Sequence, residues 1–323
     1  MDSGSLRARR ELRRREIRRR RRGLAALSAA VLLGAAAAIV IASSSGHPRS
    51  SVRLRGGTTA ASKSGHAAQA QSSASATHTV TGPPGTAPVP ILMYHVIAAP
   101  PPGAPFPGLY VQPRLFAEQM QALKQAGWHS VTQDQVEAYW RRGVSPGAGK
   151  PIVISFDNGY QSQYSQALPV LRALGWVGDE NLQLTGLPPS QGGLGEAEIH
   201  ALVKAGWELD TQGFSHADLI ALDPAQLHYQ VAVARRVVQQ RYGVPVNWFC
   251  YPSGHYNAAV VAEVRAAGYT GSTTVVPGWT HPDDDPYRLH RLRVLGGTTA
   301  RQLLVLLAGI REDPPAPASY GGA

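Results

Sequence analysis

The sequence predicts an α/β fold built on a parallel sheet or barrel, preceded by one membrane helix and a flexible linker. Apolar residues make up 43% of the 323-residue chain and there is one cysteine, so the chain has material for a hydrophobic core but not for a disulfide framework. From about residue 90, short apolar runs alternate with segments of helical spacing. Repeated strand-then-helix units of this length are typical of parallel sheets and barrels.

The first 42 residues have the pattern of a membrane signal. Residues 1–22 contain 11 arginines, and residues 23–42 contain neither a charge nor a proline. Twenty helical residues span about 30 Å, the thickness of a bilayer core, and the positive-inside rule places the arginine-rich segment in the cytoplasm. We therefore expect a single-pass protein of the cell membrane with its domain outside. Signal-peptide cleavage near the small residues 42–44, which gives a secreted protein, is the alternative.

The segments on either side of the folded part predict little structure. Residues 43–87 are mostly Ser, Ala, Gly, Thr and Pro and predict a flexible linker, while residues 313–323 are expected to form a disordered tail. The formal net charge of the chain is +10, but residues 1–22 carry +8 and the linker +4, which leaves −2 for the remainder. A slightly acidic domain over 88–312 does not favour a nucleic-acid partner.

The elements of this domain follow from the spacing of apolar residues. Short apolar runs predict strands at 89–94, 129–132, 151–156, 207–209, 248–251 and 292–294. The run 151–156 is the clearest, because it is apolar and β-branched as expected for a strand covered on both faces. Helical spacing predicts helices at 116–123, 136–140, 164–174, 196–204, 224–242, 258–267 and 299–310.

Polar residues gather directly after several of these strands. His95 follows the first strand, Asp157 and Asn158 follow the strand 151–156, and two further groups lie at 212–216 and 251–254. In parallel sheets and barrels the carboxyl ends of the strands meet at one edge, where the chemistry of such folds is found. These four groups are therefore expected to form one site.

Five segments in this order resemble the polysaccharide deacetylases of carbohydrate esterase family 4. They read ILMYH (91–95), SFDNG (155–159), ELDTQGFSHADL (208–219), FCYPSGHYN (249–257) and DPYRLHRLRV (285–294). The early Met-Tyr-His run is similar to the branch that includes poly-N-acetylglucosamine deacetylases, in which the catalytic-acid His precedes the Asp motif. The resemblance implies a distorted (β/α) barrel that removes N-acetyl groups from a cell-wall or extracellular polysaccharide. It also implies a divalent metal, usually zinc, held by one Asp and two His.

The resemblance implies roles for individual residues of the catalytic and metal site. Asp157 takes the position of the general base, His95 that of the catalytic acid, and His216 that of the second metal-ligand His. The other two metal-ligand positions depart from the family, because its Asp is Asn158 here and its first His is Gln212. Amide oxygens suit calcium or magnesium better than zinc, and catalytic zinc usually has three strong protein ligands. Asn158 and Gln212 are therefore either weak metal contacts or structural hydrogen-bonding amides.

The fourth and fifth segments imply substrate contacts. Tyr251 begins a Tyr-Pro-x-Gly turn with Pro252 and Gly254, at the place where a backbone N–H of the family helps to bind the oxyanion. Arg288 lies in the segment that helps to order the catalytic Asp.

Two functions from different classes follow. The first is an exported, metal-dependent N-deacetylase of an N-acetylated polysaccharide. The second is a catalytically impaired homologue that binds glycan or a partner at the cell envelope. The altered pair Asn158 and Gln212 is the feature that separates them.

Overall fold

The computed structural model describes residues 82–185, 187, 192–309 and 315–321. The arginine-rich segment, the expected membrane helix and nearly all of the linker lie outside these residues. Among the helices that are described, none combines the length and the apolar character that a membrane crossing requires.

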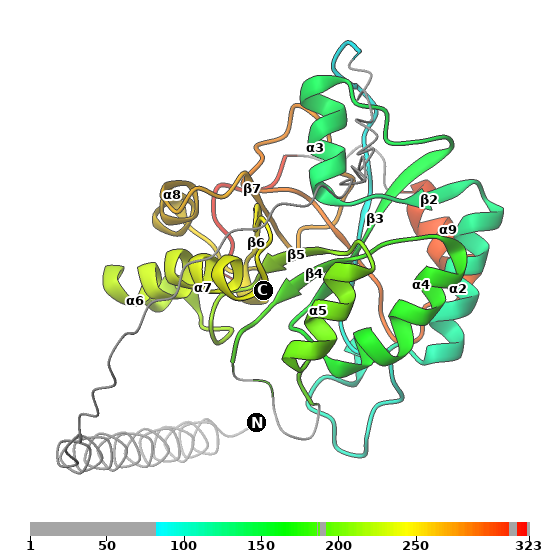
Figure 1. Ribbon diagram of the computed structural model, residues 1–323, viewed down its shortest axis with the longest axis horizontal. Helices are drawn as coiled ribbons and strands as arrows, with labels where there is room; N and C mark the ends of the chain where they lie inside the picture. Colours follow the sequence, from blue (N-terminus) through cyan, green and yellow to red (C-terminus); the bar gives the residue numbers. More distant parts are fainter. Residues whose placement is uncertain (1–81, 186, 188–191, 310–314, 322–323) are drawn as a thin grey trace, which may run out of the picture. The chain divides into compact units, whose positions relative to one another are not determined.

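Eight parallel strands form one sheet at the centre of the described domain (Figure 1). They are β1 (Ile91–Tyr94), β2 (Trp128–Ser130), β3 (Lys150–Asp157), β4 (Asp179–Leu182), β5 (Glu208–Thr211), β6 (Trp248–Cys250), β7 (Gly271–Thr273) and β8 (Leu292–Arg293). The strand order is β7-β6-β5-β4-β3-β1-β8, and β2 pairs with β3 beside this path. Because every pairing is parallel, the carboxyl ends of the strands lie at one edge.

The sheet curls into a barrel whose seam lies between β7 and β8. The segment that precedes β8 runs beside β7 without forming a regular ladder. Leu289 N–H donates to Ser272 O (3.0 Å), Thr274 N–H to Leu289 O (2.9 Å), and Arg291 N–H to Val276 O (3.0 Å). The expected distorted (β/α) barrel is thus confirmed, and part of its distortion lies where Arg291 enters the interior.

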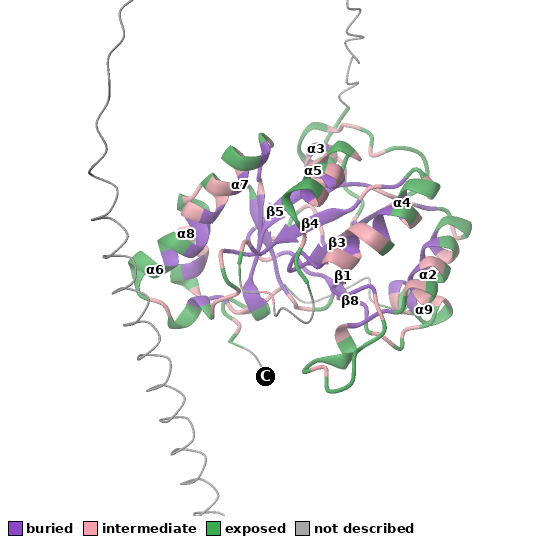
Figure 2. Ribbon diagram, turned by 60° about the horizontal axis from the view of Figure 1, so that its bottom comes forward, coloured by how far each residue is buried: buried purple, intermediate pink, exposed green. Residues whose placement is uncertain are grey.

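Helices cover the outside of the strands, with their outer faces exposed and their inner faces buried (Figure 2). The helices are α2 (Pro113–Gln125), α3 (Gln133–Arg142), α4 (Leu168–Leu174), α5 (Glu196–Lys204), α6 (Pro224–His228), α7 (Ala234–Tyr242), α8 (Ala258–Ala266) and α9 (Ala300–Gly309). A capping box fixes the start of α3, since the Thr132 side chain accepts from Gln135 N–H and the Gln135 side chain accepts from Thr132 N–H.

The alternation of side chains along the strands separates an apolar outer layer from a partly polar interior. On β3, Ile152, Ile154 and Phe156 belong to the main hydrophobic cluster under the helices. Ser155 and Asp157 alternate with them and so face the inside of the barrel, where both are buried. This arrangement places polar groups in the interior instead of a continuous apolar core.

Two strands and two helical irregularities differ from the sequence prediction. The missed strand β4 reads Asp-Glu-Asn-Leu, and the missed strand β7 reads Gly-Ser-Thr, so neither shows an apolar run. π-helical turns at Gln163–Ala167 and Tyr229–Val233 interrupt the two helices that were expected to run through 164–174 and 224–242. All the predicted strands are present, with bounds that shift by at most two residues.

The carboxy-terminal segment differs from the expected disordered tail. Over residues 315–321 the chain lies against the loop that follows β6. Tyr256 and Tyr320 exchange two backbone hydrogen bonds of 2.8 Å, and Tyr256 Oη donates to Pro317 O (2.7 Å). These backbone pairings and the partly buried Tyr320 ring hold the segment in place, although its composition is rich in Pro, Ala and Gly.

Candidate active site

A pocket of about 450 Å³ lies at the carboxyl ends of the strands. Its volume falls in the range of small-molecule sites. Seven of the nine predicted site residues line it: His95, Asp157, Asn158, Gln212, His216, Tyr251 and Gly254. The sequence analysis did not single out several other lining residues, among them Met93, Phe106, Tyr160, Gln183, Ser253 and Arg293.

Asp157 is held at the end of β3 by a two-pronged ion pair. Arg291 Nη1 donates to Asp157 Oδ1 (2.7 Å), and Arg291 Nη2 donates to Asp157 Oδ2 (2.9 Å). Asn181 Nδ2, from β4, donates to the same Oδ1 (2.9 Å). Arg291 is 1% exposed, and its Nε donates to Thr274 O (2.8 Å), so the guanidinium is fixed from two sides. The pair is fully buried and orients the carboxylate toward the pocket.

These contacts decide the charge of Asp157. Burial by itself raises the pKa of this carboxyl, but the Arg291 charge, the nearby His95 and the hydrogen bonds from Arg291 and Asn181 lower it to about 2. Asp157 is therefore ionised at neutral pH, in the form that a general base requires, but it is a weak base.

His95 lies opposite Asp157, directly after β1. Its Nε2 is 3.9 Å from Asp157 Oδ2, and its Nδ1 is buried with no hydrogen-bond partner among the described residues. Burial lowers the pKa of His95 to about 4, although the Asp157 charge opposes the shift. The imidazole is therefore neutral at pH 7.

Gln163 connects the two strand ends that carry these groups. Its Nε2 donates to His95 O (2.9 Å) and to Asp157 O (2.8 Å), and the residue is fully buried in the first π-helical turn. Such turns are frequent at functional sites because the extra residue redirects side chains. Sequence reasoning missed Gln163, since a helical glutamine has no distinctive spacing.

The two altered metal-ligand positions carry buried amides. Asn158 Nδ2 donates to the Oε1 atom of Gln183, the residue that follows β4, at a distance of 3.1 Å. Gln212 is 2% exposed, and its Oε1 has no hydrogen-bond partner within the described residues. Asn158 is thus engaged in a side-chain pair, while Gln212 Oε1 is a buried and unpaired acceptor.

Three residues of the pocket have a left-handed backbone. Asn158 (φ 80°), His216 (φ 50°) and Ser253 (φ 55°) are the only non-glycine residues with positive φ in the part of the chain that the structure describes. A non-glycine residue in this region is uncommon, and such residues cluster at functional sites. Each one follows a strand and lines the pocket.

The donor set does not fit a zinc ion. His216 is the one imidazole among the three family ligand positions, and burial lowers its pKa, against the opposing charge of Asp157. The other two positions offer neutral amide oxygens, since the bond from Asn158 to Gln183 uses only the Asn158 nitrogen. Among the described residues, His, Cys, Asp and Glu form no three-membered ligand group at the pocket. One imidazole and two amides are a weak set for zinc.

The turn after β6 has the expected shape, but the N–H of its first residue, Tyr251, already donates to another strand. Gly254 has φ 74°, and a Cβ there would lie 2.3 Å from Val275 Cγ2, so only glycine fits. Pro252 is buried and supports the turn without lining the pocket. Tyr251 N–H donates to Thr273 O (3.3 Å), so the expected oxyanion donor is engaged within the sheet.

Arg288 lies outside the pocket. Its Nε donates to Asp285 Oδ2 (2.8 Å), and its Nη1 donates to Ala316 O of the carboxy-terminal segment (3.4 Å). The residue that orders Asp157 is Arg291, three positions further along the same segment. The alternation of Arg291 and Arg293 with the apolar Leu292 and Val294 is the signal that identifies the inward face.

Known proteins share this architecture. Residues 145–272 match the family model described as Polysaccharide deacetylase. The Bacillus subtilis protein YxkH, itself named only as a candidate polysaccharide deacetylase, is 26% identical over 209 residues, which are 65% of this chain and 72% of YxkH.

Two solved structures extend the comparison. BC0361, a polysaccharide deacetylase from Bacillus cereus, aligns with a TM-score of 0.61 at 25% identity and covers 69% of each chain. IcaB from Ammonifex degensii aligns with a TM-score of 0.58 at 22% identity over 69% of this chain and 97% of its own, which shows a common fold.

The barrel and the pocket together define a deacetylase-type α/β domain. Over this domain the chain is similar to the polysaccharide deacetylase family, as its five motifs predicted.

Proposed function

We propose that the pocket binds an N-acetylated sugar of a polysaccharide without the zinc-dependent hydrolysis typical of the family. The observation that carries this proposal is the pair of buried amides, Asn158 and Gln212, at two of the three metal-ligand positions. They replace charged or strongly coordinating donors by neutral hydrogen-bonding groups. The carbonyl oxygen of Gln212 is an unpaired acceptor, and it suits the N–H of an acetamido group once the side chain turns toward the pocket.

The titratable groups of the pocket support binding over hydrolysis. Asp157 has a pKa of about 2 because Arg291 outweighs the effect of its burial, so it attracts a proton from water only weakly. His95 has a pKa of about 4 because it is buried, so it holds no imidazolium proton for a leaving amine at neutral pH. General acid–base catalysis is most efficient when these pKa values lie near the working pH.

Hydrolysis of the N-acetyl group is the second candidate. One observation favours it: Asp157 and His95, at the base and acid positions of the family, face each other across 3.9 Å at the pocket. Under this candidate, His216 and the two amides hold a divalent metal other than zinc, and acetate is released.

Restoring the family's metal donors separates the two candidates. We expect the double variant Asn158→Asp with Gln212→His to bind zinc at least about a thousandfold more tightly than the wild type. Two restored strong ligands should add about 4 kcal/mol of binding free energy, and each 1.4 kcal/mol corresponds to a factor of ten in affinity. Adding His216→Ala should abolish the gain. If only the double variant releases acetate, the result supports a wild-type protein that binds sugar and has lost its metal. Acetate release by the wild type with any divalent metal contradicts this proposal. No gain in zinc affinity would show that positions 158 and 212 are wrongly assigned.

We also propose that residues 23–42 anchor the protein in the cell membrane with the domain outside. The support is the arginine-rich segment followed by 20 uncharged residues. Protease treatment of intact cells should remove the domain, and the mass of the protein extracted from membranes should include residues 1–42. A mature chain that begins near residue 43 would indicate secretion after signal cleavage instead.

A further inference from the structure

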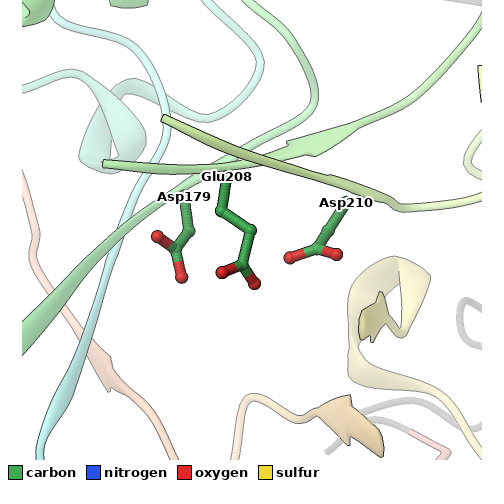
Figure 3. A group of neighbouring side chains, drawn as sticks. All are labelled: Asp179, Glu208 and Asp210. Carbon is green, nitrogen blue, oxygen red and sulfur yellow. The ribbon is translucent and has the colours of Figure 1, made fainter. Parts of the chain in front are cut away.

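Three acidic side chains lie together inside the barrel on β4 and β5 (Figure 3). Asp179 is the register partner of Glu208 across the two strands, and Asp210 is two residues further on the same face. One carboxylate oxygen from each of the three lies within 4.8 Å of the other two. None of the three residues lines the pocket described above.

The start of α3 supports two of these carboxylates. Gln133 N–H donates to Asp179 Oδ2 (2.8 Å), and Asp134 N–H donates to Glu208 Oε2 (2.9 Å). Both donors belong to the first turn of α3, whose N–H groups have no partner within the helix and carry the positive end of its dipole. The helix therefore stabilises negative charge on both side chains.

The third carboxylate is supported by the start of β6. Trp248 N–H donates to Asp210 Oδ1 (2.8 Å), as does Asn247 N–H (3.2 Å). Asp134 reinforces this contact, since its carboxylate accepts from Asn247 Nδ2 (2.7 Å) and from Trp248 Nε1 (3.0 Å). Each carboxylate of the cluster thus uses one oxygen to accept backbone N–H groups.

The second oxygen of each carboxylate accepts from no group outside the cluster, although Glu208 and Asp210 lie close enough to share a proton. Asp179 Oδ1, Glu208 Oε1 and Asp210 Oδ2 have no hydrogen-bond partner among the described residues, although Asp179 and Asp210 are 1% and 0% exposed. Gln133 adds a second sign, because its side chain is 3% exposed and neither its Nε2 nor its Oε1 is partnered. Its own N–H is the group that contacts Asp179. Buried polar atoms are nearly always paired, so four unpaired side chains in one place point to a missing ligand.

The charge of the cluster also requires a partner. Apart from one another, the charged group that bears most strongly on these side chains is Asp134, which is also acidic. Ionised carboxylates without a counter-charge are too costly to bury, so the cluster holds either a cation or additional protons. A cation accounts for the free oxygens as well, because ligating carboxylates are commonly oriented by hydrogen bonds to their other oxygen.

We propose that Asp179, Glu208 and Asp210 bind one calcium ion inside the barrel, at a site distinct from the pocket. An all-oxygen, carboxylate-rich donor set is typical of hard divalent cations. Calcium binds oxygens at about 2.3–2.6 Å, so one ion reaches oxygens up to nearly 5 Å apart, whereas magnesium at about 2.0–2.1 Å demands a tighter set. Gln133, whose N–H contacts Asp179, carries a buried and unpaired side-chain amide.

The role of the ion is structural. It joins β4 and β5 through side chains that also accept hydrogen bonds from backbone N–H groups at the starts of α3 and β6. The strand end of β4 carries Asn181, which hydrogen-bonds Asp157, so the ion also stabilises the strand that supports the pocket.

Calcium binding and thermal unfolding of the full-length protein in detergent test the proposal. Equilibrium dialysis with calcium should give one ion per chain. At a free calcium concentration 100 times the Kd, the unfolding constant should fall about 100-fold relative to protein in EDTA. Asp179→Asn should reduce the calcium affinity at least tenfold. His216→Ala should leave it unchanged, which separates this site from any metal at the pocket.

Glu180→Gln is the matched control. Glu180 lies beside Asp179 on β4 and is equally buried, but it belongs to the other face of the strand and not to the cluster. Calcium binding should survive this substitution. If Asp179→Asn does not fold, Glu208→Gln takes its place, because Glu208 is only partly buried.

Two results would overturn the proposal. In the first, calcium does not bind. If Asp179→Asn then unfolds in EDTA at the same or a higher temperature than the wild type, protons and not a cation hold the cluster together. In the second, only magnesium or manganese binds, which contradicts the assignment to calcium.

Discussion

The barrel contains two kinds of buried carboxylate, and their pKa values move in opposite directions. Asp157 on β3 and Asp179 on β4 are each 1% exposed. Burial raises the pKa of Asp157, yet Arg291 and the hydrogen bonds reverse this effect and lower it to about 2. Burial raises the pKa of Asp179 as well, and the neighbouring Glu208 raises it further. The difference shows that burial sets the cost of a charge, while the partner decides whether the charge survives.

Removing the charged partner of Asp157 should reduce the stability of the protein more than any other change considered. We expect Arg291→Met to lower the free energy of unfolding by about 3–5 kcal/mol, because it leaves a buried charge unpaired. Urea unfolding at pH 7 measures the change, and adding Asp157→Asn should recover much of it. The control is Arg288→Met, which removes a partly exposed ion pair with Asp285 and should cost less than about 1 kcal/mol. Equal costs for the two arginines would contradict the account.

Gln163 offers a test that leaves both charges in place. We expect Gln163→Ala to lower the free energy of unfolding by about 2–3 kcal/mol, because two buried carbonyl groups lose their donor and a cavity remains. Urea unfolding again provides the measurement. Gln161→Ala, which removes a partly exposed hydrogen bond to Glu198, should cost less than about 1 kcal/mol. If the two variants are equally stable, Gln163 does not hold the strand ends together.

The pH dependence of stability tests whether His95 is neutral in the folded protein. Its folded pKa of about 4 lies below its ordinary value of 6.5, so the unfolded chain takes up a proton first as the pH falls. The stability that His95 contributes is therefore present above pH 6.5 and is lost as the pH falls toward 4, by about 2 kcal/mol between pH 7 and pH 5. Urea unfolding at both values should show this loss for the wild type. His95→Gln should lose less over the same interval, and an equal loss would contradict the buried, neutral imidazole.

The smallest effect on stability is expected at the mouth of the pocket. Phe106 lines the pocket but is 68% exposed, so Phe106→Ala should change the free energy of unfolding by less than about 0.5 kcal/mol. Its ring offers a surface for a sugar, and its loss should weaken binding of an N-acetylglucosamine oligomer several-fold in calorimetry. Val305→Ala, an equally exposed position on α9, should leave the affinity unchanged. Unchanged affinity for Phe106→Ala would remove this residue from the site.

The sequence predicted which side chains gather at one pocket better than it predicted the strands that carry them. His95, Asp157, Gln212 and His216 line the same pocket, because each lies in a short segment at the end of a strand at the same edge of the sheet. β4 was missed because its interior face carries Asp179 and its outer face another acid, so no apolar period exists.

The choice between arginines shows the same limit. The segment before β8 contains three of them, and the sequence indicated Arg288 although Arg291 contacts Asp157. Which arginine enters the barrel depends on the seam between β7 and β8, where the chain follows β7 without regular pairing. That register is a tertiary property, which local spacing alone does not specify.

The most direct test of the proposed function measures binding and acetate release in the same samples. Wild-type protein is titrated calorimetrically with an N-acetylglucosamine oligomer, once in EDTA and once with zinc, and released acetate is then quantified. We expect equal affinity in both conditions and no acetate above the level of a protein-free control. Acetate release that requires zinc and is lost in Asp157→Asn would contradict it and identify a working zinc deacetylase.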